Sequence, residues 1–300
     1  MSRMPGDQVI LLGRQPFRCQ WRGIALAPGV ERHLVVDRRI LDRLDAVDLA
    51  RGFSNVYPLD GVDDASVADL IDRLVARGRP VASIATNDEY MLGMCARLQE
   101  RHGLEGPSPA DIAVFTDKMA MKHAALRAGL RTPVGMALNP HEAAADPQAC
   151  ARRVFKACGL PLVLKPRSSA NSLDVEVVRT SEELVGRCRT LRRDDLMAEE
   201  FVPGGVLFCD SLLSSTTGER TTLMTAMYAQ PPLRYRSGSC HGSQTLADGP
   251  LKARLEMFND RVLAALPALT DRVTHLEVLE HGGELWFLEV AARAPGAEVA

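Results

Sequence analysis

The last part of the sequence constrains the fold more than any other segment. Two apolar runs flank the glycine-containing turn 281–283, a pattern typical of a β-hairpin. With a loop of those three residues, Glu277 faces Phe287 across the strand pair and Glu289 shares the sheet face of Glu277. The opposite face then carries side chains that suit a core: Leu276, Val278, Trp286, Leu288 and Val290.

Two carboxylates on one sheet face, Glu277 and Glu289, suggest a site for a divalent metal ion. Hard cations such as Mg²⁺ take oxygen ligands, and Mg²⁺ is often shared between protein carboxylates and substrate phosphates. Glutamates on a solvated strand are also common without any ligand. The hairpin by itself leaves both interpretations open.

Composition excludes several classes of function. A chain of 300 residues has room for about two domains. Its formal net charge of −2 offers no basic field for nucleic acid. Without an apolar run of about 18 residues or a signal-peptide core, we expect no membrane span and a cytoplasmic protein. The seven cysteines are scattered and form no C-x-x-C pair, which favours reduced thiols over disulfides or a zinc site.

The first third of the chain has the pattern of a parallel α/β sheet. Apolar strands are predicted at 8–12, 33–36 and 80–85, and a helix over 67–77 lies between the second and third. No G-x-G-x-x-G motif follows the first strand, so the dinucleotide fingerprint is missing.

The rest of the chain alternates less regularly. Helices are predicted over 117–128, 147–158 and 251–266, and strands over 160–166, 175–178, 196–201 and 206–213.

Five short motifs follow one another through this part: FTDK at 115–118, PLVLKP at 161–166, AEEFVPG at 198–204, HLE at 275–277 and FLEVAARAPG at 287–296. Their order and spacing resemble the ATP-grasp superfamily, most closely its carboxylate–amine ligases of the L-amino-acid (dipeptide) ligase type. The resemblance covers about residues 80–298.

The resemblance implies an α/β fold with three parts. A Rossmann-like parallel sheet at 1–110 would precede a two-lobed ATP-grasp module of α+β character, with lobes at 111–195 and 196–300. The last lobe is expected to be incomplete at its C-terminal end, because superfamily members continue past R-x-x-G.

The resemblance also implies an ATP site. Lys118 and Lys165 match the two lysines that contact phosphates, and the loop 167–172 matches the phosphate loop. The residues expected to contact the nucleotide are Lys118, Lys165, Ser168, Ser169, Ser172, and the adenine-binding hinge Glu199, Glu200, Phe201 and Val202. A surface lysine at 118 and an ordinary strand end at 199–202 are the alternatives.

Metal binding and catalysis follow from the same resemblance. Glu277 and Glu289 match the ligands of Mg²⁺, with two ions expected and Mn²⁺ as a substitute. Arg293 matches the arginine that holds the acyl phosphate or tetrahedral intermediate, a task that suits its planar guanidinium. Glu89 and His241 match substrate-contacting positions. For the segment of Glu89, the alternative is that Asn87 or Asp88 only caps the following helix. For His241, the alternative is a solvated histidine in a loop.

The implied reaction joins a small-molecule carboxylate to an amino-acid-like amine. ATP phosphorylates the carboxylate, and the amine then displaces phosphate from the acyl phosphate. The missing loop glycines and the end of the chain soon after R-x-x-G favour a second hypothesis, a degenerate nucleotide-binding protein with a regulatory or scaffold role. Three residue departures from the family pattern are present. The loop 167–172 lacks glycine, Val206 replaces a ribose-binding Glu, and Ala291 replaces an Asn. A homodimer is compatible with either hypothesis.

Overall fold

The computed structural model describes residues 7–14, 29–78, 80–170, 172–215, 217–235 and 242–295. Contacts divide the chain into two compact units, Met1–Ile112 and Ala113–Ala300. His241, a candidate substrate contact, lies outside the described residues. Within the described ranges, no helix combines the length and the hydropathy of a membrane-spanning segment.

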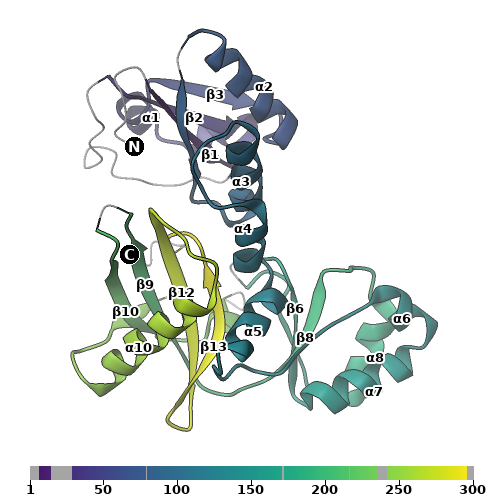
Figure 1. The fold of residues 1–300 in the computed structure, drawn as a ribbon. Helices are drawn as coiled ribbons and strands as arrows, with labels where there is room; N and C mark the ends of the chain where they lie inside the picture. Colours follow the sequence, from purple (N-terminus) through teal and green to yellow (C-terminus); the bar gives the residue numbers. More distant parts are fainter. Residues whose placement is uncertain are drawn as a thin grey trace. The chain divides into compact units, whose positions relative to one another are not determined.

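The first unit contains the parallel sheet expected from the sequence. Its strands lie in the order β3-β2-β1-β4, and every pair is parallel. They are β1 (Gln8–Gly13), β2 (Glu31–Asp37), β3 (Asn55–Leu59) and β4 (Val81–Thr86). The helices are η2 (Arg38–Arg43), α1 (Ala46–Gly52), α2 (Asp64–Val75), η3 (Glu89–Met91) and α3 (Leu92–Arg101), and α4 (Pro109–Thr116) follows. Apolar side chains of α2 and α3 pack on this sheet, and Figure 1 shows the two helices beside it.

The second unit begins with α5 (Lys118–Arg127) and a four-stranded antiparallel sheet in the order β5-β8-β6-β7. The strands are β5 (Gly135–Ala137), β6 (Leu162–Pro166), β7 (Glu176–Val178) and β8 (Leu196–Glu200). One face packs on α6 (Pro140–Ala145), α7 (Pro147–Cys158) and α8 (Ser181–Thr190) through a core that includes Val154, Leu162 and Ala198. The other face carries Lys165 and Glu199, so this sheet has one apolar and one charged face.

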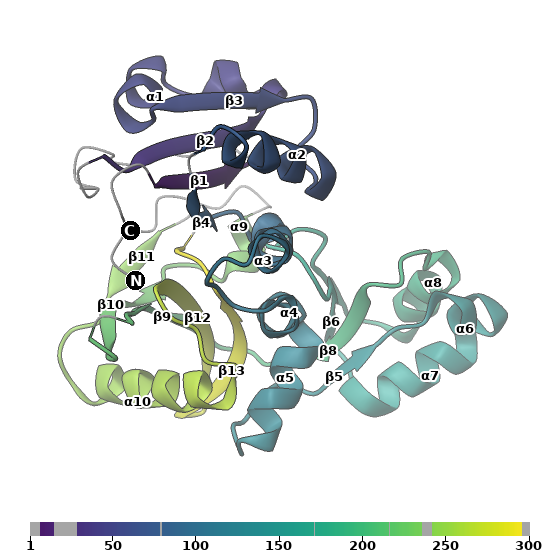
Figure 2. The same ribbon diagram turned by 45° about the horizontal axis from the view of Figure 1, so that its top comes forward.

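A five-stranded antiparallel sheet completes the unit, in the order β11-β10-β9-β12-β13. The strands are β9 (Gly205–Leu213), β10 (Arg220–Tyr228), β11 (Ser243–Thr245), β12 (Arg272–His281) and β13 (Glu284–Ala291), and the helices are α9 (Pro232–Tyr235) and α10 (Pro250–Ala265). Figure 2 shows α10 lying along this sheet. The contact includes a buried bond from Asn259 Nδ2 to Ser211 Oγ of 2.9 Å.

The closing hairpin forms, but its predicted register is wrong by one residue. The turn is Gly282-Gly283 alone, with φ of 59° and 77°. Successive residues with positive φ are typical of a tight type I′ hairpin, which glycine forms without strain. His281 therefore pairs with Glu284, and Val278, not Glu277, pairs with Phe287.

A bulge restores the carboxylate pair. The register shifts between Glu277 and Val278, so that Glu277 pairs directly with Glu289. Leu288 is the extra residue on β13. Phe287 is consequently fully buried on the core face, whereas Trp286 and Leu288, predicted to lie in the core, are only partly buried.

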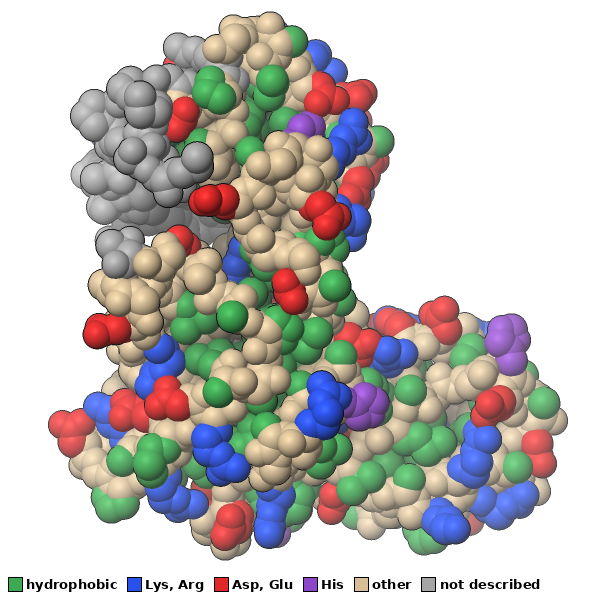
Figure 3. Space-filling model, viewed as in Figure 1, with side chains coloured by type: hydrophobic (Ala, Val, Ile, Leu, Met, Phe, Trp, Pro, Cys, Tyr) green, Lys and Arg blue, Asp and Glu red, His purple; other side chains and the backbone are tan. Residues whose placement is uncertain are grey.

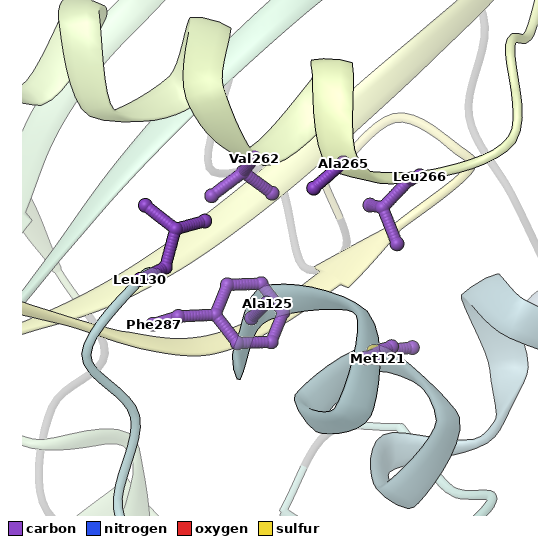
Figure 4. Close-up of a pocket in the computed structure, with 7 residues that line it drawn as sticks. All are labelled: Met121, Ala125, Leu130, Val262, Ala265, Leu266 and Phe287. Carbon is purple, nitrogen blue, oxygen red and sulfur yellow. The ribbon is translucent and has the colours of Figure 1, made fainter. Parts of the chain in front are cut away.

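The buried side of β13 contacts both α5 and α10. Figure 4 shows the Phe287 ring beside Met121 and Ala125 of α5, opposite α10. These side chains line a small apolar pocket together with Leu130, Val262, Ala265 and Leu266. The helix that begins at Lys118 is thus held against the strand that carries Glu289.

Five cysteines of the described part are buried and form no disulfide bond: Cys95, Cys150, Cys158, Cys188 and Cys209. Figure 3 shows basic and acidic side chains interspersed over the face in view, in keeping with the small net charge.

Candidate active site

The start of α5 and the start of the loop 167–172 are tied together. The Asp117 carboxylate accepts hydrogen bonds from the Met119 and Ala120 amides and so caps α5. The same carboxylate pairs with the Arg167 guanidinium, whose Nε lies 3.2 Å from Asp117 Oδ1. The Lys118 amide donates to the Arg167 carbonyl at 2.9 Å. The helix N-terminus, which favours anions, therefore lies beside the candidate phosphate loop.

Lys118 connects this loop to the closing hairpin. Its Nζ donates to the Ser169 carbonyl at 2.7 Å and lies 3.2 Å from Glu289 Oε2. The ammonium group is buried, whereas the Glu289 side chain is 31% exposed. The Lys118 ammonium of α5 and the Glu289 carboxylate of β13 thus lie next to each other. Because Glu289 is partly exposed, this pair lies near the solvent, where a charged ligand can bind.

Lys165 and Glu199 form a buried ion pair on the charged face of the first sheet. Lys165 Nζ lies 2.7 Å from Glu199 Oε2. A second lysine, Lys122 of α5, lies 2.5 Å from the other oxygen, Glu199 Oε1. All three side chains are at most 5% exposed. Burial alone would raise the pKa of Glu199, but the charges of Lys165 and Lys122 lower it, so the carboxylate is ionised.

Glu277 is held by a second buried cluster. Tyr228 Oη donates to Glu277 Oε1 at 2.9 Å, and His275 Nε2 lies 3.4 Å from the same oxygen. His275 Nδ1 lies 2.6 Å from Asp210 Oδ1. Burial by itself would lower the pKa of His275, but its hydrogen bonds to Asp210 and Glu277 raise it to about 9. At neutral pH an imidazolium therefore lies between two carboxylates.

The donor set at the hairpin fits Mg²⁺. Among the described residues no group of three or more His, Cys, Asp or Glu side chains is arranged around a metal position. Glu277 and Glu289 nevertheless lie opposite each other on one face and supply hard oxygen donors. Mg²⁺ is usually bound through one or two carboxylates plus phosphates and water, so this pair has the expected number of protein ligands.

The remaining hinge residues lie at the end of β8. Glu200 Oε2 accepts from the Val134 amide at 3.1 Å, Phe201 is partly buried, and Val202 is buried. Gly204 passes close to β12, since a Cβ there would lie 2.2 Å from the Glu280 carbonyl oxygen. The hinge segment is therefore fixed against the strand that carries Glu277.

One of the three loop serines contacts Lys118. Ser168 is exposed, Ser169 supplies its carbonyl to Lys118, and Ser172 has a left-handed backbone with φ of 51°. Glycine adopts this conformation more readily, so the glycine-free loop contains a turn that glycine ordinarily provides.

Two further candidates make contacts within their own segments. Arg293 follows β13 and donates to the Ala294 carbonyl at 2.7 Å. Glu89 begins η3 in the first unit, where Asp88 caps the turn by accepting from the Tyr90 amide, as the capping interpretation expects.

Sequence reasoning missed Lys122, Asp210 and Tyr228. The signal for Lys122 was present, because Lys118 and Lys122 are spaced i, i+4 and so share one helix face. Asp210 lies on β9, whose pairing with β12 was not predictable from local pattern, and Tyr228 lies on β10, the next strand beyond β9. No motif marked either residue.

No protein-family model matches the chain, and no curated protein matches it by sequence. Solved structures do. An L-amino acid ligase from Bacillus licheniformis has a TM-score of 0.71 at 18% identity, over 98% of this chain and 68% of that one. An N5-carboxyaminoimidazole synthetase from Staphylococcus aureus, complexed with ADP, has a TM-score of 0.70 at 10% identity, over 97% and 71%.

A third structure is the biotin carboxylase domain of the Hydrogenobacter thermophilus 2-oxoglutarate carboxylase, in complex with MgADP, ADP and bicarbonate. It has a TM-score of 0.68 at 19% identity, over 96% of this chain and 64% of that one. The same fold thus occurs in ligases with different substrates. The chain shares the fold of these three enzymes, the ATP-grasp fold that its motifs predicted.

Proposed function

We propose that the protein is an ATP-dependent ligase that joins a carboxylate to an amine and releases ADP and phosphate. The fold is that of such ligases. The observation that carries the proposal is the direct pairing of Glu277 with Glu289, with the Lys118 ammonium 3.2 Å from Glu289. Two opposed carboxylates and a buried lysine form a site for a metal-bound polyphosphate.

Each charged residue has a separate task in this proposal. Lys118 and Lys165 bind phosphate oxygens, and the hinge Glu199–Val202 receives the adenine. Glu277 and Glu289 would hold Mg²⁺, which when bound neutralises charge on the transferring phosphoryl group. Tyr228 and His275 orient Glu277 through the contacts at 2.9 and 3.4 Å.

The chemistry needs little acid–base machinery from the protein. The substrate carboxylate oxygen bonds to the γ-phosphorus as ADP leaves, and the resulting acyl phosphate is attacked by the amine nitrogen as phosphate leaves. Arg293 would hold the developing oxyanion with its guanidinium. Glu89 and His241 are proposed to contact the substrates. The division of the second unit into lobes at 111–195 and 196–300 is likewise a proposal.

An L-amino-acid substrate is the finer part of the proposal. It rests on the motif resemblance and on the likeness to the L-amino acid ligase. The test is ADP release from MgATP with single L-amino acids and with pairs, followed by mass spectrometry of the product.

Amino-acid-dependent ADP release with a new amide product supports the proposal. Binding of ATP without release of ADP across the whole panel would contradict it and favour the regulatory alternative. Lys165→Met should lose activity, and Lys156→Met, which alters an exposed lysine on α7, should keep it.

A further inference from the structure

The buried lysine at the centre of the second unit has no task in the reaction proposed above. Lys122 is 1% exposed, and its Nζ lies 2.5 Å from Glu199 Oε1, 2.9 Å from Thr132 Oγ1 and 3.0 Å from the Pro133 carbonyl. An ammonium group has three donors and no acceptor. All three donors of Lys122 meet acceptors, so the position is built for this cation.

The surrounding backbone leaves room for the lysine stem. Gly135 of β5 pairs with Glu199 of β8 and so lies on the same sheet face. A Cβ at Gly135 would lie 3.0 Å from both Lys122 Cδ and Met197 Cε. Real side chains rarely approach so closely, and a larger residue at 135 would push Lys122 away from Glu199.

The charges of the site are divided unequally between its two sides. On the first sheet, Lys122 and Lys165 share the single carboxylate of Glu199, which leaves one positive charge in excess. On the second sheet, the carboxylates of Glu277 and Asp210 both contact the single ring of His275, so acidic groups outnumber basic ones. Lys118 and Glu289 balance each other. The excess charges have the signs that an anionic phosphate and a metal cation require.

We propose that Lys122 is a positioning residue for nucleotide binding: it neutralises and holds Glu199, so that the charge of Lys165 is left for a phosphate anion. The inference rests on the proposed ATP site. Without Lys122, Glu199 is balanced by Lys165 alone, and the first sheet has no net charge to offer a phosphate. Lys122 itself is enclosed by its three acceptors and need not touch the nucleotide.

The proposal makes a charge-based prediction that a packing role does not make. Lys122→Met removes one positive charge, and the double variant Lys122→Met/Glu199→Gln restores the wild-type excess of one. Glu199→Gln alone raises the excess to two. The probe is inorganic tripolyphosphate, because it lacks the adenine that Glu199 is expected to contact, and its dissociation constant is measured by isothermal titration calorimetry.

Lys122→Met should weaken tripolyphosphate binding by about tenfold or more, since the lost charge lies within a few ångströms of Lys165 in a poorly screened site. The double variant should return to within about threefold of wild type, and Glu199→Gln should bind at least as tightly as wild type. Lys156→Met, the exposed control on α7, should match wild type. Circular dichroism and the melting temperature establish that each variant is folded.

Equal binding by Lys122→Met and wild type, or weak binding by the double variant when it is folded, would overturn the role of Lys122. If Lys122→Met does not fold, the comparison of wild type, Glu199→Gln and the double variant decides the question, and weaker binding by Glu199→Gln than by wild type overturns it. Failure of the wild-type protein to bind both ATP and tripolyphosphate is a separate outcome, which overturns the proposed function together with this inference.

Discussion

Glu277 and Glu289 are direct partners across the pair of strands β12 and β13. Like charges at opposed positions destabilise a sheet unless another charge compensates them. Lys118 contacts Glu289, and the His275 imidazolium lies 3.4 Å from Glu277. The pair is therefore compensated by one cation from α5, Lys118, and one from β12 itself, His275, as expected of a site that is kept for a ligand.

Glu289→Gln should lower kcat by about a hundredfold or more, because a neutral amide replaces one of two oxygen donors expected to hold Mg²⁺ at the transferring phosphoryl group. Steady-state ADP release measures the change. Glu284→Gln, at an exposed position on the same strand, is the control and should leave kcat unchanged. Wild-type turnover in Glu289→Gln would remove this residue from the metal site.

Tyr228→Phe should raise the Mg²⁺ concentration needed for half-maximal activity by about 10- to 100-fold, because it removes the phenol that donates to Glu277 Oε1 and keeps the ring. A titration of activity against Mg²⁺ at saturating ATP tests this. Tyr57→Phe in the first unit controls for loss of a phenol elsewhere. An unchanged Mg²⁺ requirement would show that Tyr228 only fills space.

Phe287→Ala should lower the free energy of unfolding by about 3–5 kcal/mol, since the ring is fully buried between β13, α5 and α10. Urea denaturation followed by circular dichroism gives the value. Phe155→Ala, at a ring that is 52% exposed on α7, should change stability by at most about 0.5 kcal/mol. Similar losses in both variants would contradict the assignment of Phe287 to the core.

Gly283→Ala should destabilise the protein by about 1–2 kcal/mol, because φ at this position is 77° and a Cβ disfavours that conformation. Gly186→Ala within α8 should have the opposite effect and stabilise the protein by about 0.5–1 kcal/mol. A Cβ at Gly186 meets no atom within 4 Å. Thermal unfolding of the two variants compares them directly, and effects of the same sign would refute the turn geometry.

Stability should fall as the pH rises above about 9. Burial raises the pKa of Cys158 and of Cys209 from 9.0 to about 11, and burial with a hydrogen bond to Cys150 raises that of Cys188 to about 12. A raised pKa means that the folded state holds the proton more tightly. The stabilisation is thus complete below the pKa of the unfolded thiol and is lost as the pH approaches 11–12.

The urea midpoint at pH 7.5 and at pH 10 measures this loss. A variant with the three thiols replaced by alanine is the control and should show a smaller decrease between the two pH values. With Cys19 and Cys240 changed to serine, native protein at pH 8 should also react slowly with a thiol reagent. Fast reaction would place these thiols at the surface.

Local pattern was sufficient for much of the fold. The parallel strands of the first unit, the helix that begins at Lys118, and the strands carrying Lys165 and Glu199 are marked by apolar runs, caps and glycines that act over a few residues. Edge strand β3 was missed because Pro58 lies within it and its side chains are only partly buried.

The predicted hairpin register was wrong for a physical reason. Counting residues across a turn assumes strict alternation, and the bulge at Leu288 breaks that alternation at the site. Contacts between residues far apart in the sequence were also not predicted, because they depend on tertiary packing. From the sequence, Lys122 is an ordinary charged residue on a helix. Only the folded structure shows that Glu199 lies beside it.

The bulge has a consequence for what the hairpin can tolerate. Phe287 before the bulge and Val290 after it both lie on the core face, and the extra residue Leu288 between them leaves Glu289 opposite Glu277 on the other face. The number of residues at the tip of the hairpin therefore does not determine whether Glu277 and Glu289 face each other. The hairpin can be lengthened by one residue pair in each strand beyond Glu280 and keep Glu277 opposite Glu289, and deletion of Leu288 alone would remove the bulge and still leave Glu289 as the partner of Glu277. The tip is thus the place in this lobe to graft an epitope or a fluorescent reporter without altering the carboxylates.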